Sequence, residues 1–222
     1  MSLQKYAWFA ERVLILFIML LYMKKSWIWE KVIILHWRQR TNRNSVHWPQ
    51  NTRNWIPWLK EQLENKWYEV YNPLINNDWE VNYKNWKEKI EKTDKKIKID
   101  WNTTLIWHSA WWAFWVRWLG ETKRLVKKLI LIVPVKTMDV KRDNGFDSKN
   151  WFWKFEIDKN IKDRVLEIYV FISNDKDFIV EDGKNYAKIL EAKLIDLPNR
   201  WHFSIWEWFE NNDKLEELLE II

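Results

Sequence analysis

The chain has 222 residues and a formal net charge of +6, and 47% of its residues are hydrophobic. These values are typical of one soluble globular domain and exclude a disordered chain, while the mixing of lysines with acidic residues argues against a nucleic-acid partner. The absence of cysteine excludes disulfides, thiolate metal sites and a cysteine nucleophile, and agrees with a cytoplasmic location.

Residues 1–30 are predicted to be an extension separate from a domain over 31–222. Residues 13–23, VLILFIMLLYM, form an uninterrupted apolar run between Arg12 and Lys24. The run is shorter than the about 20 residues that span a bilayer, and no small-residue cleavage site follows it. Three interpretations stay open: an anchor that brings the protein to a membrane, a buried or docking helix, and a leader translated from a start codon too far upstream.

From residue 31 onward, short apolar segments rich in β-branched residues alternate with amphipathic segments of helical spacing. This alternation predicts an α/β fold, a three-layer α/β/α sandwich with a mostly parallel central sheet. In such sheets the active groups lie beyond the carboxyl ends of the strands. We predict strands over 31–36, 68–73, 103–107, 128–135, 166–173 and 192–198, and helices over 56–66, 79–93, 110–119, 182–191 and 212–222.

The stretch TTLIWHSAWWAFWVRWLG combines a strand, a turn with a serine and a helix. A nucleophile elbow has the pattern G-x-S-x-G, because its serine sits in a strained turn where strand and helix nearly touch. The corresponding positions here are Trp107, His108, Ser109, Ala110 and Trp111. The context therefore fits an elbow, although tryptophans stand where glycines are expected. The alternative for the serine is a helix N-cap.

Tryptophan is unusually abundant and glycine unusually rare, with 21 and 3 residues, whereas glycine is ordinarily about 7% of a chain. Replacing tryptophan by glycine in the written sequence restores a turn motif at several places. We expect that the gene uses UGA codons for glycine and that these codons have been translated as tryptophan. The alternative is that the tryptophans are real, by mutation or by design. In that case we expect poor folding or a closed site, because bulky side chains in tight turns destabilise the fold. The expected glycine positions are Trp37, Trp67, Trp107, Trp111, Trp112 and Trp201.

With these positions in view, residues 31–222 resemble the small serine hydrolases of the retinoblastoma-binding-protein-9 type, a compact branch of the α/β-hydrolase fold. The resemblance depends on the order of elements, the WIPWL piece at 55–59, the elbow, a late aspartate-containing loop, and the HF pair at His202 and Phe203. It implies a lidless domain that cleaves a small ester or amide through an acyl-serine intermediate, without a cofactor.

The resemblance also implies a catalytic triad. Ser109 would be the nucleophile, and His202, which follows the last predicted strand, would be the general base, as the chain order Ser…Asp…His requires. For the acid, counting from the end of the fifth strand favours Asp175, whereas the D-x-x-V pattern of relatives favours Asp177. Asp177 is preferred and Asp175 is the alternative, and Asp182 is expected to cap the next helix.

The oxyanion hole would use the backbone N–H of Ala110 and another near Trp37 or Arg38. His36 and His108 flank these two turns, and we expect them to orient the backbone rather than to do chemistry. The four histidines lack metal-ligand spacing, and no phosphate-binding glycine loop is present, so no metal and no cofactor are predicted.

Two other functions compete with hydrolysis of a small acyl substrate. The first is a non-catalytic interaction module on the same fold, with Ser109 buried and inert. The second is single-strand nucleic-acid binding by aromatic stacking, which is disfavoured because many tryptophans fall at apolar strand ends or on helix core faces. The acyl group, the leaving group and the oligomeric state stay open.

Overall fold

The computed structural model describes residues 29–36, 55–73, 83–109, 114–136, 155–204 and 214–222. Its centre is a six-stranded sheet with the order β2-β1-β3-β4-β5-β6, and all five strand pairings are parallel. The predicted parallel sheet is therefore confirmed. The strands are β1 (Lys31–His36), β2 (Glu69–Tyr71), β3 (Thr103–His108), β4 (Val126–Ile132), β5 (Val165–Ile172) and β6 (Lys193–Asp196).

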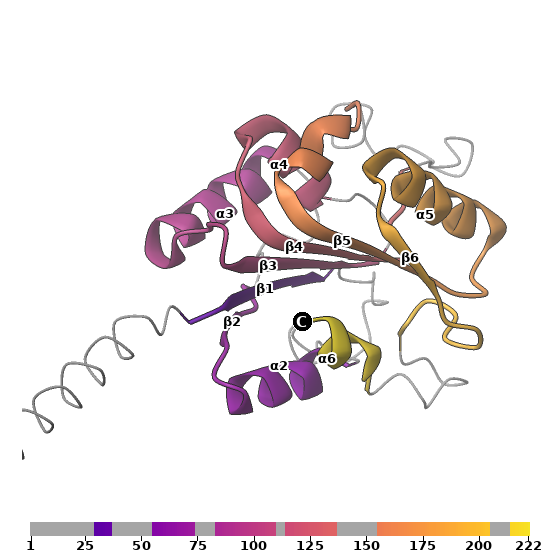
Figure 1. Cartoon of the computed structure of the whole chain (residues 1–222), viewed down its shortest axis with the longest axis horizontal. Helices are drawn as coiled ribbons and strands as arrows, with labels where there is room; N and C mark the ends of the chain where they lie inside the picture. Colours follow the sequence, from indigo (N-terminus) through magenta and orange to yellow (C-terminus); the bar gives the residue numbers. More distant parts are fainter. Residues whose placement is uncertain (1–28, 37–54, 74–82, 110–113, 137–154, 205–213) are drawn as a thin grey trace, which may run out of the picture.

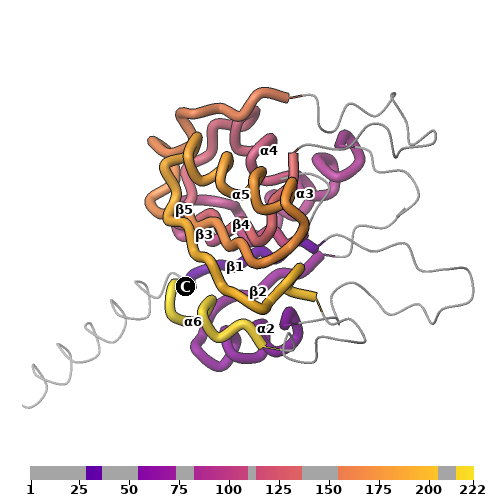
Figure 2. The backbone as a smooth tube through the Cα atoms, turned by 90° about the vertical axis from the view of Figure 1, so that its right-hand side faces the viewer, coloured from indigo at the N-terminus to yellow at the C-terminus, as the bar shows by residue number. Residues whose placement is uncertain are grey.

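The helices cover both faces of this sheet, as the three-layer prediction requires. Figure 1 shows α3, α4 and α5 on one face and α2 and α6 on the other, and Figure 2 shows the same two layers from the side. A short 3-10 helix before β5 was not expected from the sequence. The helices are α2 (Ile56–Asn65), α3 (Tyr83–Ile97), α4 (Phe114–Thr122), η3 (Lys159–Asp163), α5 (Asp177–Leu190) and α6 (Glu217–Ile221).

The four central strands β1, β3, β4 and β5 are largely apolar because both of their faces are buried. In β1, Ile33 and Leu35 point into the cluster beneath α3 and α4, whereas Val32 and Ile34 point into the cluster beneath α2 and α6. The parallel register brings the carboxyl ends of β1, β3, β4 and β5 to the same edge of the sheet. That edge is where the site is expected.

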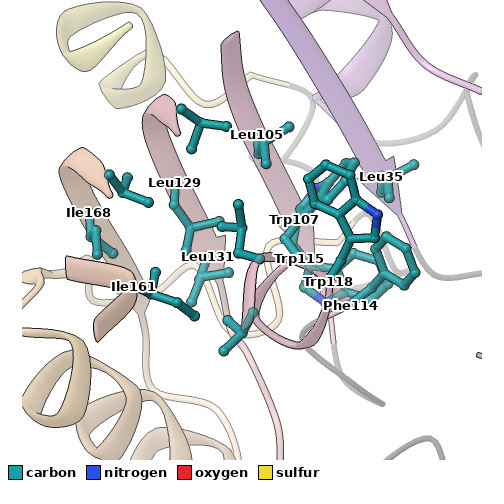
Figure 3. Close-up of a cluster of buried hydrophobic side chains, with 14 of the residues drawn as sticks. Leu35, Leu105, Trp107, Phe114, Trp115, Trp118, Leu129, Leu131, Ile161 and Ile168 are labelled. Atoms are coloured by element: carbon teal, nitrogen blue, oxygen red, sulfur yellow. The ribbon is translucent and has the colours of Figure 1, made fainter. Parts of the chain in front are cut away.

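Large aromatic side chains fill the core on the α4 side of the sheet. Trp115 and Trp118 are fully buried on α4, and the indole Nε1 of Trp115 donates to the carbonyl oxygen of Ile106 at 3.0 Å. Figure 3 shows both indoles beside Phe114 and Trp107, next to the leucines of the strands. Burial of these rings stabilises the packing of α4 against the sheet.

The predicted extension over 1–30 lies outside the described residues except for Trp29 and Glu30. The apolar run over 13–23 is part of that undescribed segment, so its three interpretations stay predictions. In the parts of the chain that the structure describes, none of the helices is both long enough and apolar enough to cross a membrane.

Candidate active site

The serine of the predicted elbow follows the last residue of β3 in a left-handed backbone conformation. Ser109 has a φ of 87°, in a region that residues other than glycine seldom adopt. Its N–H donates to the carbonyl oxygen of Ile132, the last residue of β4, at 3.0 Å. The ladder between β3 and β4 therefore holds the main chain at Ser109, and this strained conformation is the one expected of a nucleophile elbow.

The hydroxyl of this serine lies against a histidine from the far end of the chain. The Oγ atom of Ser109 is 2.9 Å from Nε2 of His202, although the two residues are 93 positions apart in the sequence. His202 lies on the loop after β6, which the sheet order brings to the carboxyl edge of the strands. The structure thus brings together the two residues that the sequence predicted as nucleophile and base.

The other nitrogen of the same imidazole contacts a carboxylate. The Nδ1 atom of His202 is hydrogen-bonded to Oδ2 of Asp175, whose side chain is only 2% exposed. A carboxylate accepts hydrogen bonds, so Nδ1 carries a hydrogen, and the tautomer with its only hydrogen on Nδ1 has an unprotonated Nε2. Ser109 therefore donates its hydroxyl hydrogen to Nε2, which is the orientation that a general base needs.

The carboxylate beside His202 is the alternative of the sequence prediction and not the preferred one. Asp177 is the first residue of α5, which begins five residues before the predicted start at 182. A carboxylate at that place is stabilised by the helix dipole, and the D-x-x-V pattern therefore marks a helix start here. Asp182 is not a cap either: it is buried within α5, and its Oδ2 accepts from the N–H of Lys136 at 2.8 Å.

Two polar residues that the sequence analysis did not single out fasten the aspartate loop to the histidine loop. The Oγ atom of Ser173 donates to the carbonyl oxygen of Leu197 at 2.6 Å and accepts from the N–H of Arg200 at 3.0 Å. Oδ1 of Asn174 accepts from the N–H of Asn199 at 2.9 Å. A Ser-Asn pair directly before the aspartate, at the end of an apolar strand, is the signal that could have indicated this role.

Three imidazole rings lie together beside the elbow. The centroid of the buried His108 ring is 4.6 Å from that of His36 and 6.0 Å from that of His202. Burial, followed by the neighbouring His36 and His202, holds the pKa of His108 well below its usual value. The His108 ring is therefore neutral and places no positive charge beside His202.

Two of the tryptophans expected at glycine positions have the backbone of a glycine position. The φ of Trp67 is 66° and that of Trp201 is 46°, both in the left-handed region that glycine adopts without steric cost. Trp67 follows the end of α2, where a left-handed residue commonly ends a helix. The expectation that these two positions suit glycine agrees with their geometry.

Trp107 does not follow the steric expectation. It lies in β3, its ring is fully buried, and the indole Nε1 donates to the carbonyl oxygen of Ser109 at 2.9 Å. The ring packs between Trp86 and Phe114, with centroid distances of 5.6 and 6.4 Å, and Figure 3 shows it near Phe114. An indole therefore fits beside the elbow serine at this position, because α3 and the first turn of α4 leave room for it.

The remaining predicted site residues lie outside the described part of the chain. They include all three candidates for the oxyanion hole, so the structure does not place the predicted donors. Within the described ranges, no group of three or more histidine, aspartate or glutamate side chains is arranged to hold a metal ion. The predicted positions that lie outside the described residues are Trp37, Arg38, Ala110, Trp111 and Trp112.

Comparison with known proteins gives matches among solved structures. No family model matches the chain, and no curated protein sequence does. The ydeN gene product from B. subtilis is 18% identical over 86% of this chain and 96% of its own, with a TM-score of 0.70. A predicted CIB-like hydrolase from Thermoplasma acidophilum is 13% identical over 86% of this chain and 83% of its own, with a TM-score of 0.54.

A third similar structure is the 2-hydroxy-6-oxo-6-phenylhexa-2,4-dienoate hydrolase from Rhodococcus sp. strain RHA1. It is 16% identical over 87% of this chain and 90% of its own, with a TM-score of 0.55. At these identities the likeness concerns the fold. The chain has the α/β-hydrolase fold, as its sheet order and helix layers also indicate.

Proposed function

We propose that this protein is a serine hydrolase that cleaves a small ester or amide through an acyl-serine intermediate. The observation that carries the proposal is the chain of hydrogen bonds from Ser109 through His202 to Asp175, with a Ser109 Oγ to His202 Nε2 distance of 2.9 Å. The three residues come from three separate loops at the carboxyl edge of the sheet, where this fold places its active groups. They occur in the order Ser…Asp…His that is usual for the fold.

The arrangement performs acyl transfer in two steps. The Oγ atom of Ser109 attacks the carbonyl carbon while Nε2 of His202 takes the hydroxyl hydrogen, and the resulting imidazolium is stabilised by the Asp175 carboxylate. The imidazolium then protonates the leaving alcohol or amine as the bond to it breaks. In the second step water adds to the acyl-serine, His202 takes a proton from it, and the acid leaves as Ser109 regains its hydrogen.

We propose the donors of the oxyanion hole from their sequence positions relative to Ser109 and β1. The N–H of Ser109 already bonds to the carbonyl of Ile132, so it is not free to bind the developing oxyanion. We place one donor at the N–H of Ala110, directly after the nucleophile, and the second near Trp37 or Arg38, directly after β1. Such donors stabilise the transition state, and removal of one of them typically costs about 3–4 kcal/mol.

The structural neighbours support hydrolysis in general, because two of those named above are called hydrolases. The compact type that resembles retinoblastoma-binding protein 9 is a finer proposal. It is supported by the elbow and by the HF pair at His202 and Phe203. A small acyl substrate follows from this type, since its members are compact.

A fluorophosphonate probe tests the proposal on the full chain. We expect it to label Ser109, with the adduct located by mass spectrometry, and we expect hydrolysis of p-nitrophenyl acetate. Ser109→Ala should abolish both signals while the circular dichroism spectrum stays unchanged. Labelling at another residue, or equal hydrolysis by the Ser109→Ala variant, would overturn the assignment.

A non-catalytic module on the same fold is the second candidate, because Ser109 is only 7% exposed and the buried Trp107 indole bonds to its carbonyl. We therefore propose a second variant in which Trp37, Trp111 and Trp112 are all replaced by glycine. Labelling that appears only in this variant would show a serine hydrolase closed by indoles, and would favour UGA codons read as glycine. No labelling in either protein would favour the module.

A further inference from the structure

His108 precedes Ser109 by one residue, yet its ring belongs to the interior of the protein. Its exposed fraction is 0%. The ring packs edge-on against His36 and lies tilted against the indole of Trp55, with centroid distances of 4.6 and 5.4 Å. A polar ring buried among aromatic groups is expected to have a hydrogen-bond partner.

The partner of this ring is the main chain of the catalytic histidine. Nε2 of His108 lies 2.9 Å from the carbonyl oxygen of His202. A carbonyl oxygen only accepts, so Nε2 carries the hydrogen, and the neutral ring has none on Nδ1. Nδ1 is itself buried and has no hydrogen-bond partner among the described residues. Among the described residues, the hydrogen bond that this side chain makes is therefore directed at His202.

The loop that carries His202 needs such external support. Trp201 and Phe203, on either side of it, have φ values of 46° and 51°. Left-handed conformations in residues other than glycine persist only where the surroundings enforce them. The bonds from Ser173 and Asn174 described above end at residue 200, so they do not reach the residue that bears the imidazole.

The structure assigns His108 a positioning role: its Nε2–H holds the carbonyl of His202 and thereby fixes the imidazole relative to the turn that carries Ser109. This inference rests on the proposed function. The bond joins the nucleophile's turn directly to the base's loop. A shift of this loop would therefore change the separation between Oγ of Ser109 and Nε2 of His202.

Within the described ranges, a second group bonds to the same carbonyl and supplies the control. Oγ of Ser204 donates to the carbonyl oxygen of His202 at 3.1 Å. That bond joins residues two apart in one loop, so it does not relate the loop to the elbow. The loss of the Ser204 hydroxyl should leave the positions of His202 and Ser109 relative to each other nearly unchanged.

Three variants of the full chain test the role, with p-nitrophenyl acetate as substrate. His108→Leu keeps an apolar group of similar size without a donor, and it should lower kcat by about 100-fold with little change in KM, as misplacement of a catalytic group does. His108→Gln restores a donor and should recover about tenfold of this loss. Ser204→Ala should stay within about threefold of the wild type. Equal kcat in the wild type and His108→Leu would overturn the inference.

A measurement without turnover separates this inference from the proposed function. Nitrogen-15 NMR of the wild-type histidines should show His108 as the neutral tautomer with its hydrogen on Nε2. A hydrogen on Nδ1, or a protonated ring at neutral pH, would overturn the positioning role even if the protein is active or if His108→Leu does not fold. Failure of fluorophosphonate labelling in both the wild type and the variant with glycine at positions 37, 111 and 112 would overturn the hydrolase proposal and leave this NMR result intact.

Discussion

Replacing Asp175 with asparagine removes one negative charge beside His202 with almost no change in side-chain volume. Asp175 is 2% exposed and His202 is 17% exposed at their side chains, so the pair is poorly screened by water. Asparagine can also turn its amide NH₂ group towards Nδ1, which would favour the wrong tautomer of the imidazole. The substitution therefore removes both the charge and the orientation that the base requires.

The expected magnitude follows from this contact. In the transition state His202 becomes an imidazolium, and two unit charges about 4 Å apart interact by about 4 kcal/mol at an effective dielectric constant near 20. About 4 kcal/mol corresponds to about three powers of ten in rate. Loss of the correct tautomer adds to the rate loss caused by removal of the charge, so we expect kcat to fall by about 10³–10⁴-fold. KM should change little, because the carboxylate faces the imidazole and not the substrate.

Asp177→Asn is the matched control, because it makes the same chemical change two residues further along the chain. Asp177 opens α5, so its carboxylate interacts with the helix dipole. Removal of the charge should lower the free energy of unfolding by about 0.3–1 kcal/mol and leave kcat within about threefold of the wild type. The two variants thus separate catalysis from stability.

Both variants are assayed by p-nitrophenyl acetate hydrolysis and by the rate of fluorophosphonate labelling, with circular dichroism as the test of folding. Asp175→Asn should lose both activities and keep its spectrum. A large loss of kcat in Asp177→Asn together with a nearly active Asp175→Asn would refute the assignment. It would mean that the D-x-x-V pattern of relatives, and not the contact in this structure, identifies the acid.

Three further predictions concern stability. A Cβ at Gly183 would lie 2.4 Å from a methyl group of the last residue of β5, so Gly183→Ala should lower the free energy of unfolding by about 1–3 kcal/mol in urea titrations. Gly120→Ala, where the nearest atom lies 3.4 Å away, is the control, and equal losses at both sites would contradict the packing argument. The Tyr169 hydroxyl, with neighbouring lysines, lowers the pKa of Glu167 to about 2. This carboxylate therefore stabilises the fold fully above its unfolded pKa of about 4.3, and the contribution is lost as the pH falls towards 2. Stability should therefore fall less steeply between about pH 5 and pH 2 in Glu167→Gln than in the wild type, and identical slopes would count against the linkage. Trp67 is 65% exposed with a φ of 66°, so Trp67→Gly should raise the free energy of unfolding by about 1 kcal/mol, whereas a decrease would show that its packing outweighs the backbone cost.

The sheet and the contact between Ser109 and His202 could be predicted because their signals are local. The four central strands are short, largely apolar and rich in β-branched residues, because both of their faces are buried. Ser109 stands between a clear strand and an amphipathic helix, and His202 follows the last strand. Each of these positions depends on a pattern within about ten residues, which a sequence displays directly.

Which aspartate contacts His202 could not be chosen from the sequence, because the answer depends on where α5 begins. Both Asp175 and Asp177 lie in the stretch between β5 and the amphipathic part of α5. The side chain of Asp182 looks like a cap in the sequence, yet it is buried in the helix and bonded to the main chain of Lys136. In the structure α5 already starts at Asp177, so Asp175 lies in the loop before it and contacts His202.

Trp107 shows why a steric rule for a motif position depends on its surroundings. A small residue is required before the elbow serine only if the helix that follows leaves no space next to the strand. Here the unfavourable backbone conformation falls on Ser109 itself, with its φ of 87°, while Trp107 keeps ordinary strand geometry. Its indole enters a space lined by Trp86 and Phe114. The argument for glycine is therefore strong at Trp67 and Trp201, where the backbone itself is left-handed, and weak at Trp107.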